Sequence, residues 1–398
     1  MSQTQPDIDH VSDLLKTVEQ IAPTLEKYGA EAEEQRRLSK PVVEAMQETG
    51  LLKLWVPKAF GGYEADPMAA FQIFEAVAKI DGAAGWNLQI STSVHPFLAW
   101  LPDEGPQEIY QNGPDVILGG ALFPPGQATP VDGGYRLSGR WPFVSGCHHC
   151  DWYMAPSLIM DGDNPALAED GQPLQILTFF SAKDTEILDT WHTVGMRGTG
   201  SHDVIAKEIF VPQHRTAMMM PLENPGKAYQ GALYHMTIWP PVAALAPPAL
   251  GIASAAIADL IDLAKKKTPS FTGTTLRERP DAQARIARAE AIVGAGRAYL
   301  HEALREGWET AEQRKILPLQ QKLKIQMATI YAIQSSADAV KLIHSAAGSS
   351  AIRKEYKFQQ YFRDVNTITQ HAHASPSRYQ SIGNLMFGLE MDWPFFAL

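Results

Sequence analysis

The residues whose types and spacing suggest chemistry begin with a serine that follows a strand-like segment. Residues 134–144 read GYRLSGRWPFV, in which aromatic and β-branched residues alternate with polar ones, and this pattern predicts a β-strand. Ser145 and Gly146 come next and place a hydroxyl donor beside a residue without a side chain. A flat ligand could approach the backbone here and accept a hydrogen bond, although a hairpin with a polar tip explains the same residues equally well.

Two histidines are candidates for proton transfer to or from a substrate. His95 lies among apolar and small residues, and its ordinary pKa near working pH would let it take or lend a proton. A core histidine bonded to a backbone carbonyl is the alternative. His371 lies in a predicted final helix, residues 361–373, where a cap that interacts with the helix dipole is its alternative. On such a helix His371 and His373 would diverge and would not chelate one metal.

Other motifs narrow the chemistry mainly by their absence. Cys147 and Cys150 flank two histidines, but no second cysteine pair or HxxxH motif follows, so free thiols are expected and no metal site. The sequence lacks GxSxG, a Walker loop and HExxH, the motifs of hydrolases, NTPases and zincins. The glycine-rich loop at 195–200 precedes a strand pattern, not a helix, and so fails as a dinucleotide-binding loop. If the chain is an enzyme, a cofactor must supply the hard chemistry.

Composition limits the class of protein. The chain has 398 residues, 45% of them hydrophobic, and 34 Lys and Arg against 44 Asp and Glu give a net charge of −10. An acidic chain without a basic cluster argues against binding to nucleic acid or to an anionic membrane surface. Residues 1–13 are polar and acidic, which indicates no signal peptide. Prolines interrupt the uncharged run 228–258, so we expect no membrane span there and a cytoplasmic protein.

The elements that must position these residues fall into three parts. Apolar residues at helical spacing predict helices on both sides of a region of short strands. Asp81 is a plausible N-cap for one helix, and the small residues after it permit close helix packing. The helical patterns cover much of residues 10–50, then 68–80, the segment from 81 to about 91–97, 247–266, 283–306 and 317–346. We therefore expect an N-terminal helical domain (1–115), a central β-domain (116–235) and a C-terminal helical bundle (236–398).

Several of these segments resemble the acyl-CoA dehydrogenase superfamily. The text GYRLSGRWPFVSG at 134–146, VGMRGTGSHDV at 194–204 and a strand ending in Val211-Pro212 are similar to the family's middle domain. Arg363-Asp364 followed by His371 resembles the flavin-dependent monooxygenase branch of that family. The resemblance covers nearly the whole chain. It implies an α+β, mainly α fold with an N-terminal helical domain, a small central β-barrel and a C-terminal four-helix bundle.

The resemblance also implies a function. Members of this branch are oxygenase components of two-component monooxygenases, and they act on phenol-, indole- or dibenzothiophene-type aromatics. They use reduced FAD or FMN and O2, through a C4a-hydroperoxyflavin, to hydroxylate or epoxidise the substrate. Because the chain has no second nucleotide fold for NADH, a separate NAD(P)H-dependent flavin reductase is expected to supply the reduced flavin. A homotetramer built on the C-terminal helices is implied as well.

The same resemblance assigns roles to individual residues. Ser145, at the flavin N5 edge, His371 and His95 are expected to be catalytic, and His95 would activate or orient the substrate. The residues expected to bind flavin are Trp141, Phe143, Ser145, Thr199 and Ser201. The residues expected to bind substrate are His95, Trp86, Phe97, Phe123 and Trp239.

Two departures from the family's pattern keep other functions open. The loop 267–273 has no arginine of the kind that contacts flavin phosphates in a neighbouring subunit. Ala372 stands at about the place of the proton-abstracting glutamate of many dehydrogenases, and no carboxylate lies between Asp364 and Glu390. This argues against simple acyl-CoA dehydrogenation. The alternatives are an acyl-CoA dehydrogenase or oxidase with a displaced base, an S- or N-oxygenating member of the branch, and a helical scaffold that has lost flavin.

Overall fold

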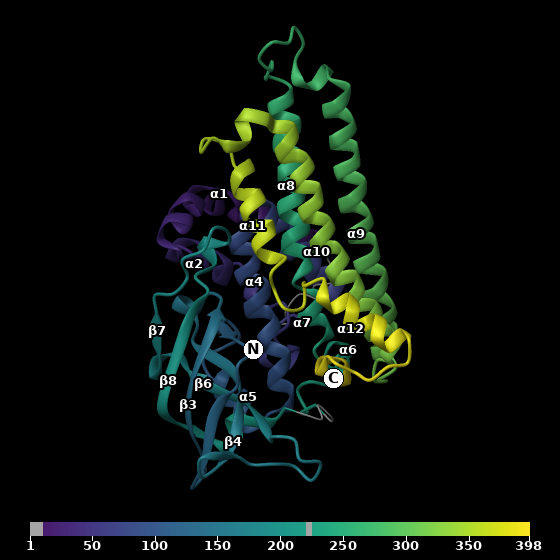
Figure 1. The fold of residues 1–398 in the computed structure, drawn as a ribbon. Coiled ribbons are helices and arrows are strands. Elements are labelled where there is room, and N and C mark those ends of the chain that lie inside the picture. Colours follow the sequence, from purple (N-terminus) through teal and green to yellow (C-terminus); the bar gives the residue numbers. More distant parts are fainter. Residues whose placement is uncertain (1–10, 220–224) are drawn as a thin grey trace.

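The computed structural model describes residues 11–219 and 225–398, in which most helices lie to one side of a twisted sheet (Figure 1). The long helices fill the upper right of the view, the sheet lies at the lower left, and α4 lies between them. The expectation that the chain lacks a signal peptide rests largely on residues 1–10, which lie outside the described part.

The N-terminal part is helical, as the sequence predicts. In α1 the buried residues Leu14, Val18, Ile21 and Leu25 recur at helical spacing, so one face of the helix packs against the core. Gly50, in the left-handed region at φ 74°, follows the second helix and turns the chain. The described α-helices before the sheet are α1 (Val11–Gln35), α2 (Lys40–Glu48), α3 (Pro67–Ile80), α4 (Gly82–Val94) and α5 (Glu104–Ile109).

The start of α4 is fixed by a cap and by close packing. The Asp81 carboxylate accepts a hydrogen bond from the Ala84 N–H at 2.8 Å, which confirms Asp81 as the N-cap. A Cβ at Gly85 would lie 2.5 Å from the Cβ of Ala78 on α3 and 2.7 Å from its backbone N. The absent side chain therefore lets the two helices touch, and the next residue, Trp86, is placed by that contact.

The central strands form one sheet with the order β7-β8-β3-β2-β4-β6-β9, and β1 and β5 pair with β4. The end strands β7 and β9 do not pair with each other among the described strands, so backbone hydrogen bonds do not close the expected small barrel. The strands are β1 (Leu118–Gly120), β2 (Gly126–Val131), β3 (Gly134–Val144), β4 (Trp152–Asp161), β5 (Asn164–Pro165), β6 (Gln175–Ser181), β7 (Glu186–Leu188), β8 (His202–Pro212) and β9 (Thr216–Met218).

The C-terminal part is a bundle in which α10 packs against α8, α9 and α11. The segment Trp239–Ala264 is long and apolar enough to cross a membrane. However, its most apolar stretch of 18 residues is 78% buried inside the protein, as expected of a core helix. Its prolines stand in the first turns of two consecutive helices, where a missing N–H costs little. The helices are α6 (Ala232–His235), α7 (Trp239–Ala243), α8 (Ala246–Ala264), α9 (Pro280–Glu312), α10 (Leu319–Ala347), α11 (Phe358–Ile368) and α12 (Ser377–Met386).

Two cores hold the molecule together. One apolar cluster runs through both helical parts, and a separate cluster that includes Leu137, Trp141 and Phe180 lies inside the β-domain. The Arg297 guanidinium on α9 binds the Glu75 carboxylate on α3, so an ion pair also joins the N-terminal helices to the bundle. The sequence-based domain borders at 115 and 235 stay predictions.

We expect Gly85→Ala to destabilise the protein by about 1–3 kcal/mol, because the added methyl meets the Ala78 backbone. Gly294→Ala is a matched control in α9, where nothing lies within 4 Å of the added Cβ. That change should leave stability equal or raise it by up to about 1 kcal/mol. Urea unfolding of both variants measures the effects, and equal stabilities would contradict the close contact between α3 and α4.

Candidate functional site

The end of strand β3 carries the serine hydroxyl that the sequence singled out. A β-bulge separates Trp141 from Val144, and Phe143 within it has a positive φ of 61°. This local distortion turns the chain so that Ser145 faces α4, with its side chain buried. The Ser145 Oγ accepts a hydrogen bond from the indole Nε1–H of Trp86 at 3.0 Å. Gly146 follows at φ 69°, and a Cβ there would lie 3.0 Å from the Asn87 amide oxygen.

A chain of hydroxyls continues from Ser145 into the loop before β8. The Ser145 Oγ lies 2.8 Å from the Ser201 Oγ, which lies 2.6 Å from the Thr199 Oγ1. Thr199 donates its hydrogen to the backbone oxygen of Met196 at 2.8 Å. Since each hydroxyl has one hydrogen, Ser201 then donates to Thr199, and Ser145 donates to Ser201. The Ser145 oxygen keeps one free lone pair, and its hydrogen can reach a ligand only by leaving Ser201.

His371 approaches this cluster from the C-terminal part. Its ring lies 6.0 Å from the Trp86 ring in an edge-to-face arrangement. The His371 Nδ1 accepts a hydrogen bond from the His373 backbone N–H at 3.3 Å, so the proton of the neutral ring is on Nε2. Burial lowers the pKa of His371 to about 4, which keeps the ring neutral at working pH.

The expectation that His371 and His373 diverge on a helix is wrong. The helix α11 ends at Ile368, and both histidines lie in the turns that follow. Their rings stack with centroids 6.0 Å apart. His373 is a structural residue, because its Nδ1 faces the Gln326 amide oxygen at 3.2 Å and its backbone oxygen accepts from the same amide. A further helix, α12, follows the one that the sequence indicated as final.

His95 lies deeper in the N-terminal part. It begins the short 3-10 helix after α4, roughly 13 Å along the helix axis from Trp86 at 1.5 Å per residue. Its side chain is fully buried, and its Nδ1 lies 2.7 Å from the Tyr110 hydroxyl, not from a backbone carbonyl. The Nε2 has no hydrogen-bond partner. Burial lowers the pKa of His95 to about 3.

The structure thus brings together some of the residues chosen from sequence and separates others. Trp86 joins Ser145 to His371, and Ser201 and Thr199 extend the same network. Phe143 is 68% exposed and meets Trp191 edge-to-face at 6.2 Å, whereas Trp141 packs inside the β-domain core. The other expected substrate contacts lie apart: Phe97 against Trp100, Phe123 exposed, and Trp239 stacked on Phe396.

Two residues that were not predicted to belong to the site, Tyr110 and Asp364, hold parts of it in place. Tyr110 binds His95, and nothing in its spacing marks it, since the contact crosses from a different helix. Asp364 was noted only as part of a motif. Its buried carboxylate accepts the Met196 N–H at 2.6 Å and so ties α11 to the loop that carries Thr199.

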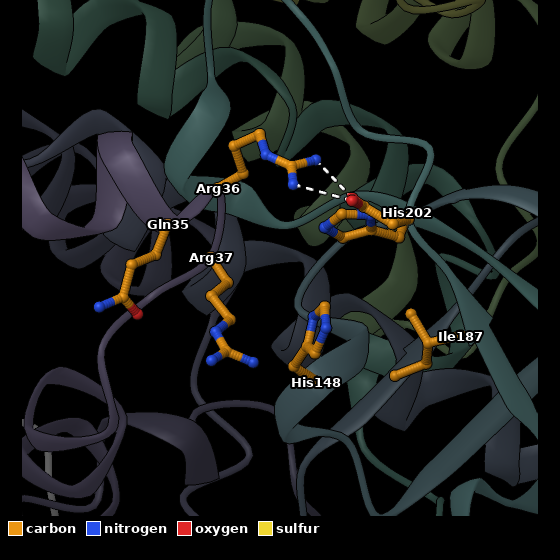
Figure 2. A pocket seen from close by; sticks show the side chains of 7 residues that line it. Gln35, Arg36, Arg37, His148, Ile187 and His202 are labelled. Atoms are coloured by element: carbon orange, nitrogen blue, oxygen red, sulfur yellow. Dashed lines mark hydrogen bonds and ion pairs between the residues drawn. The ribbon is translucent and has the colours of Figure 1, made fainter.

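Two cavities adjoin this region. The larger, about 310 Å³, opens between the end of α1 and the β-domain (Figure 2). Arg36 there forms an ion pair with Asp189, and the His202 Nδ1 accepts the Thr190 and Trp191 N–H groups, so the ring is neutral. The smaller, about 20 Å³, lies beside Ser145 and is lined in part by Asn87, whose amide atoms have no partner. It has room for about one water molecule.

The Cys-His-His-Cys segment does not gather into a metal-binding group. The structure has two free thiols, and burial raises the pKa of Cys147 to about 12. The Cys147 and Cys150 thiols donate to the backbone oxygens of Gly200 and Gly146. Within residues 11–219 and 225–398 no three His, Cys, Asp or Glu side chains are close enough to hold a metal ion.

Comparisons with known proteins agree with this architecture. The sequence profile of the acyl-CoA dehydrogenase N-terminal domain matches residues 10–105, and that of the C-terminal domain matches residues 243–376. The chain is 30% identical to an indole-3-acetate monooxygenase of Pseudomonas putida, over 90% of this chain and 89% of that protein. It is 27% identical to the flavin-dependent monooxygenase, oxygenase subunit HsaA, of Rhodococcus jostii (strain RHA1), over 94% and 98% of the two chains.

Solved structures are similar over the whole length. The crystal structure of 3-HSA hydroxylase from Rhodococcus sp. RHA1 has a TM-score of 0.89 at 25% identity and covers 98% of this chain and 100% of its own. XiaF from Streptomyces sp., in complex with FADH2 and glycerol, has a TM-score of 0.87 at 24% identity, with 96% and 97% covered. Both confirm the expected fold.

Asp364→Asn tests the contact between α11 and the Met196 loop. Burial raises the pKa of Asp364 to about 7, with Glu33 and Asp81 adding to the rise and the Met196 N–H and Arg363 opposing it. A raised pKa gives stability that is present below about pH 4 and lost as the pH rises through 7. Asparagine keeps a hydrogen-bond acceptor but does not ionise, so the variant avoids this loss of stability. The loss is about 1.4 kcal/mol for each tenfold difference in the proton affinity of Asp364 between the folded and the unfolded chain. Urea unfolding from pH 5 to 8 should therefore show the variant gaining on the parent, and parallel profiles would contradict a buried, protonated Asp364.

Proposed function

The chain belongs to the acyl-CoA dehydrogenase family, and from this we propose that it is the oxygenase component of a two-component flavin-dependent monooxygenase. It uses reduced flavin and O2 to hydroxylate or epoxidise an aromatic or heteroaromatic substrate, such as a phenol or an indole. The similarity to proteins named indole-3-acetate monooxygenase and oxygenase subunit supports the proposal.

The observation that carries the proposal is the joining of Ser145 and His371 through Trp86. Abstraction of an acyl-CoA α-proton needs a base, and the chain has no Asp or Glu between Asp364 and Glu390. With a pKa of about 4, His371 is a weak base for that step. As a neutral ring with an Nε2–H it is instead a hydrogen-bond donor, which suits stabilisation of charge on oxygen.

The residues at the end of β3 fit a flavin. An exposed Phe143 ring stands two residues from the buried Ser145 hydroxyl, and Trp191 flanks it, so a flat ring system would cover apolar surface and reach a hydroxyl. Ser145 and Phe143 would hold such a ring, and Ser201 and Thr199 support Ser145 through the hydroxyl chain. When bound, reduced flavin supplies the electrons that activate O2.

The chain's own side chains then orient the reactants. The Trp86 indole holds Ser145 in place, and Ser145 can exchange its donated hydrogen between Ser201 and an acceptor on the ligand. Lys267, the cation of the loop that lacks the family's arginine, binds the Ala347 backbone oxygen and the Ser350 hydroxyl. Two of the three hydrogens of this ammonium group are therefore used within the chain.

Three further parts of the proposal concern the cell and the assembly. A separate NAD(P)H-dependent reductase delivers the reduced flavin, in line with relatives named as oxygenase subunits or components. The protein is cytoplasmic, and its two free thiols suit a reducing compartment. It forms a homotetramer through the C-terminal part, where large apolar side chains are exposed: Met386, Phe387, Leu389 and Met391.

The function is tested by mixing the purified protein with reduced FAD or FMN, ¹⁸O₂ and a panel of phenols and indoles. Incorporation of one ¹⁸O atom into a product is the expected result. Bleaching of oxidised flavin by acyl-CoA without any reductant would instead favour the dehydrogenase alternative.

Ser145→Ala should lower the product formed per reduced flavin by about 10- to 100-fold and raise hydrogen peroxide release, because one hydrogen bond at the reacting ring is lost. Ser201→Ala should keep the yield, since it frees the Ser145 hydrogen for the ligand. Ser138→Ala is the matched control on the same strand, where the hydroxyl binds Glu208. Equal yields for the Ser145 and Ser138 variants would refute the role of Ser145.

The assembly is tested by size-exclusion chromatography with light scattering. We expect about four times the chain mass of 43.8 kDa. Phe387→Ser, at a side chain that is 86% exposed in the single chain, should shift the mass downward without unfolding the protein. A monomer for the unaltered chain would rule out the tetramer.

A further inference from the structure

His95 is a buried imidazole with one partner and one unsatisfied nitrogen. Its side chain is 0% exposed, the Nδ1 lies 2.7 Å from the Tyr110 hydroxyl, and the Nε2 has no partner. Buried polar atoms usually have partners, so the unpaired Nε2 is a position that a ligand atom or a water molecule can fill. Whether Nε2 offers a hydrogen or a lone pair decides which ligand group it can bind.

The chemistry of the Tyr110–His95 contact sets the direction of its hydrogen bond. A phenol O–H is a better donor than a neutral imidazole N–H, and an imidazole nitrogen is a better acceptor than a phenol oxygen. A 2.7 Å contact is the usual length for a bond donated by a hydroxyl. Tyr110 therefore donates to Nδ1, and the single hydrogen of the neutral ring is on Nε2.

Tyr229 is a neighbour of this pair through Phe60. Its ring packs against Phe60, which also stacks on Tyr110. The Tyr229 hydroxyl makes no hydrogen bond in the structure, so it does not bear on the direction of the Tyr110–His95 bond.

Ring packing fixes the relative positions of His95, Tyr110 and Tyr229. Tyr110 stacks on His95 at 5.8 Å between centroids, with the planes 13° apart, and on Phe60 at 4.7 Å. Tyr229 also contacts Phe60, at 6.3 Å. The loss of one hydroxyl would leave these apolar contacts in place, so the hydrogen bond can be tested apart from the packing.

We propose that Tyr110 holds His95 as the Nε2–H tautomer, so that the substrate presents an acceptor atom to His95. A phenol oxygen, a carboxylate or a carbonyl meets this requirement, and a ring N–H that can only donate does not. Tyr110 is thus a positioning residue that sets substrate polarity at this end of the site. The inference rests on the proposed function for the presence of an aromatic substrate, but not for the tautomer.

The tautomer is tested directly by ¹⁵N NMR of histidine-labelled protein, with His95 assigned by its loss in a His95→Gln variant. We expect an unprotonated Nδ1 and a protonated Nε2 in the unaltered chain. In Tyr110→Phe the two His95 signals should move toward an exchange-averaged mixture of tautomers. A protonated Nδ1 in the unaltered chain, or an unchanged spectrum in Tyr110→Phe, would overturn the proposal.

Substrate polarity is tested by calorimetric binding of two bicyclic probes, quinoline, whose nitrogen only accepts, and indole, whose N–H donates. The unaltered protein should prefer quinoline by about tenfold, the weight of one hydrogen bond. The preference should fall to near one in Tyr110→Phe and persist in Tyr234→Phe, a control because Tyr234 is equally buried but has no bond to His95. A preference for indole, equal preferences in all variants, or binding of neither probe would refute the selectivity.

The two proposals fail separately. Probe preference and the expected tautomer without any oxygenated product would reject the monooxygenase and keep the role of Tyr110. Oxygenation with a probe preference that Tyr110→Phe leaves unchanged would do the reverse.

Discussion

The site depends on one buried side chain, Trp86, which touches all three parts of the molecule. It stands on α4, donates its indole hydrogen to Ser145 at the end of β3, and presents its ring edge-to-face to His371 beyond α11. A tryptophan suits this place because its ring packs as a large apolar group while its one N–H meets a polar partner. The position of Trp86 in turn depends on Gly85, since any side chain there would push α4 away from α3.

The polar groups around Trp86 leave little freedom. The hydroxyl chain Ser145, Ser201 and Thr199 runs in one direction to the Met196 oxygen, and Asp364 fixes Met196 from the other side through its backbone N–H. A change at Asp364 on α11 therefore affects the position of Ser145, although these two residues do not contact each other. Burial of such a network is acceptable only when each member has a partner, and this one nearly meets that condition.

Sequence patterns predicted most of the fold, because helices and strands with one buried face have apolar residues at regular spacing. The N-cap at Asp81, the strand at 134–144 and the long helices of the bundle are all confirmed. The helix predicted through His373 was wrong: it ends at Ile368, and packing in the turns beyond it determines how His371 and His373 lie. A contact such as that between Tyr110 and His95 cannot be predicted from residue spacing. It joins two separate elements, and only the packing of those elements brings the side chains together. The barrel was expected by resemblance, yet pairing of the end strands depends on sheet curvature, which no local pattern encodes.

His371 and His95 are both held as neutral rings with the hydrogen on Nε2, although by different partners. This protonation state fits oxygen chemistry better than proton abstraction. His371 has its Nδ1 occupied by a backbone N–H, and His95 has its Nδ1 facing a phenol. Burial holds the pKa of the first at about 4 and of the second at about 3, so both rings are neutral donors through the working range of pH. A neutral donor in a dry site stabilises negative charge that develops on an oxygen without itself losing a proton. A carboxylate at Ala372 would serve the opposite purpose, and its absence is consistent with the way these two rings are held.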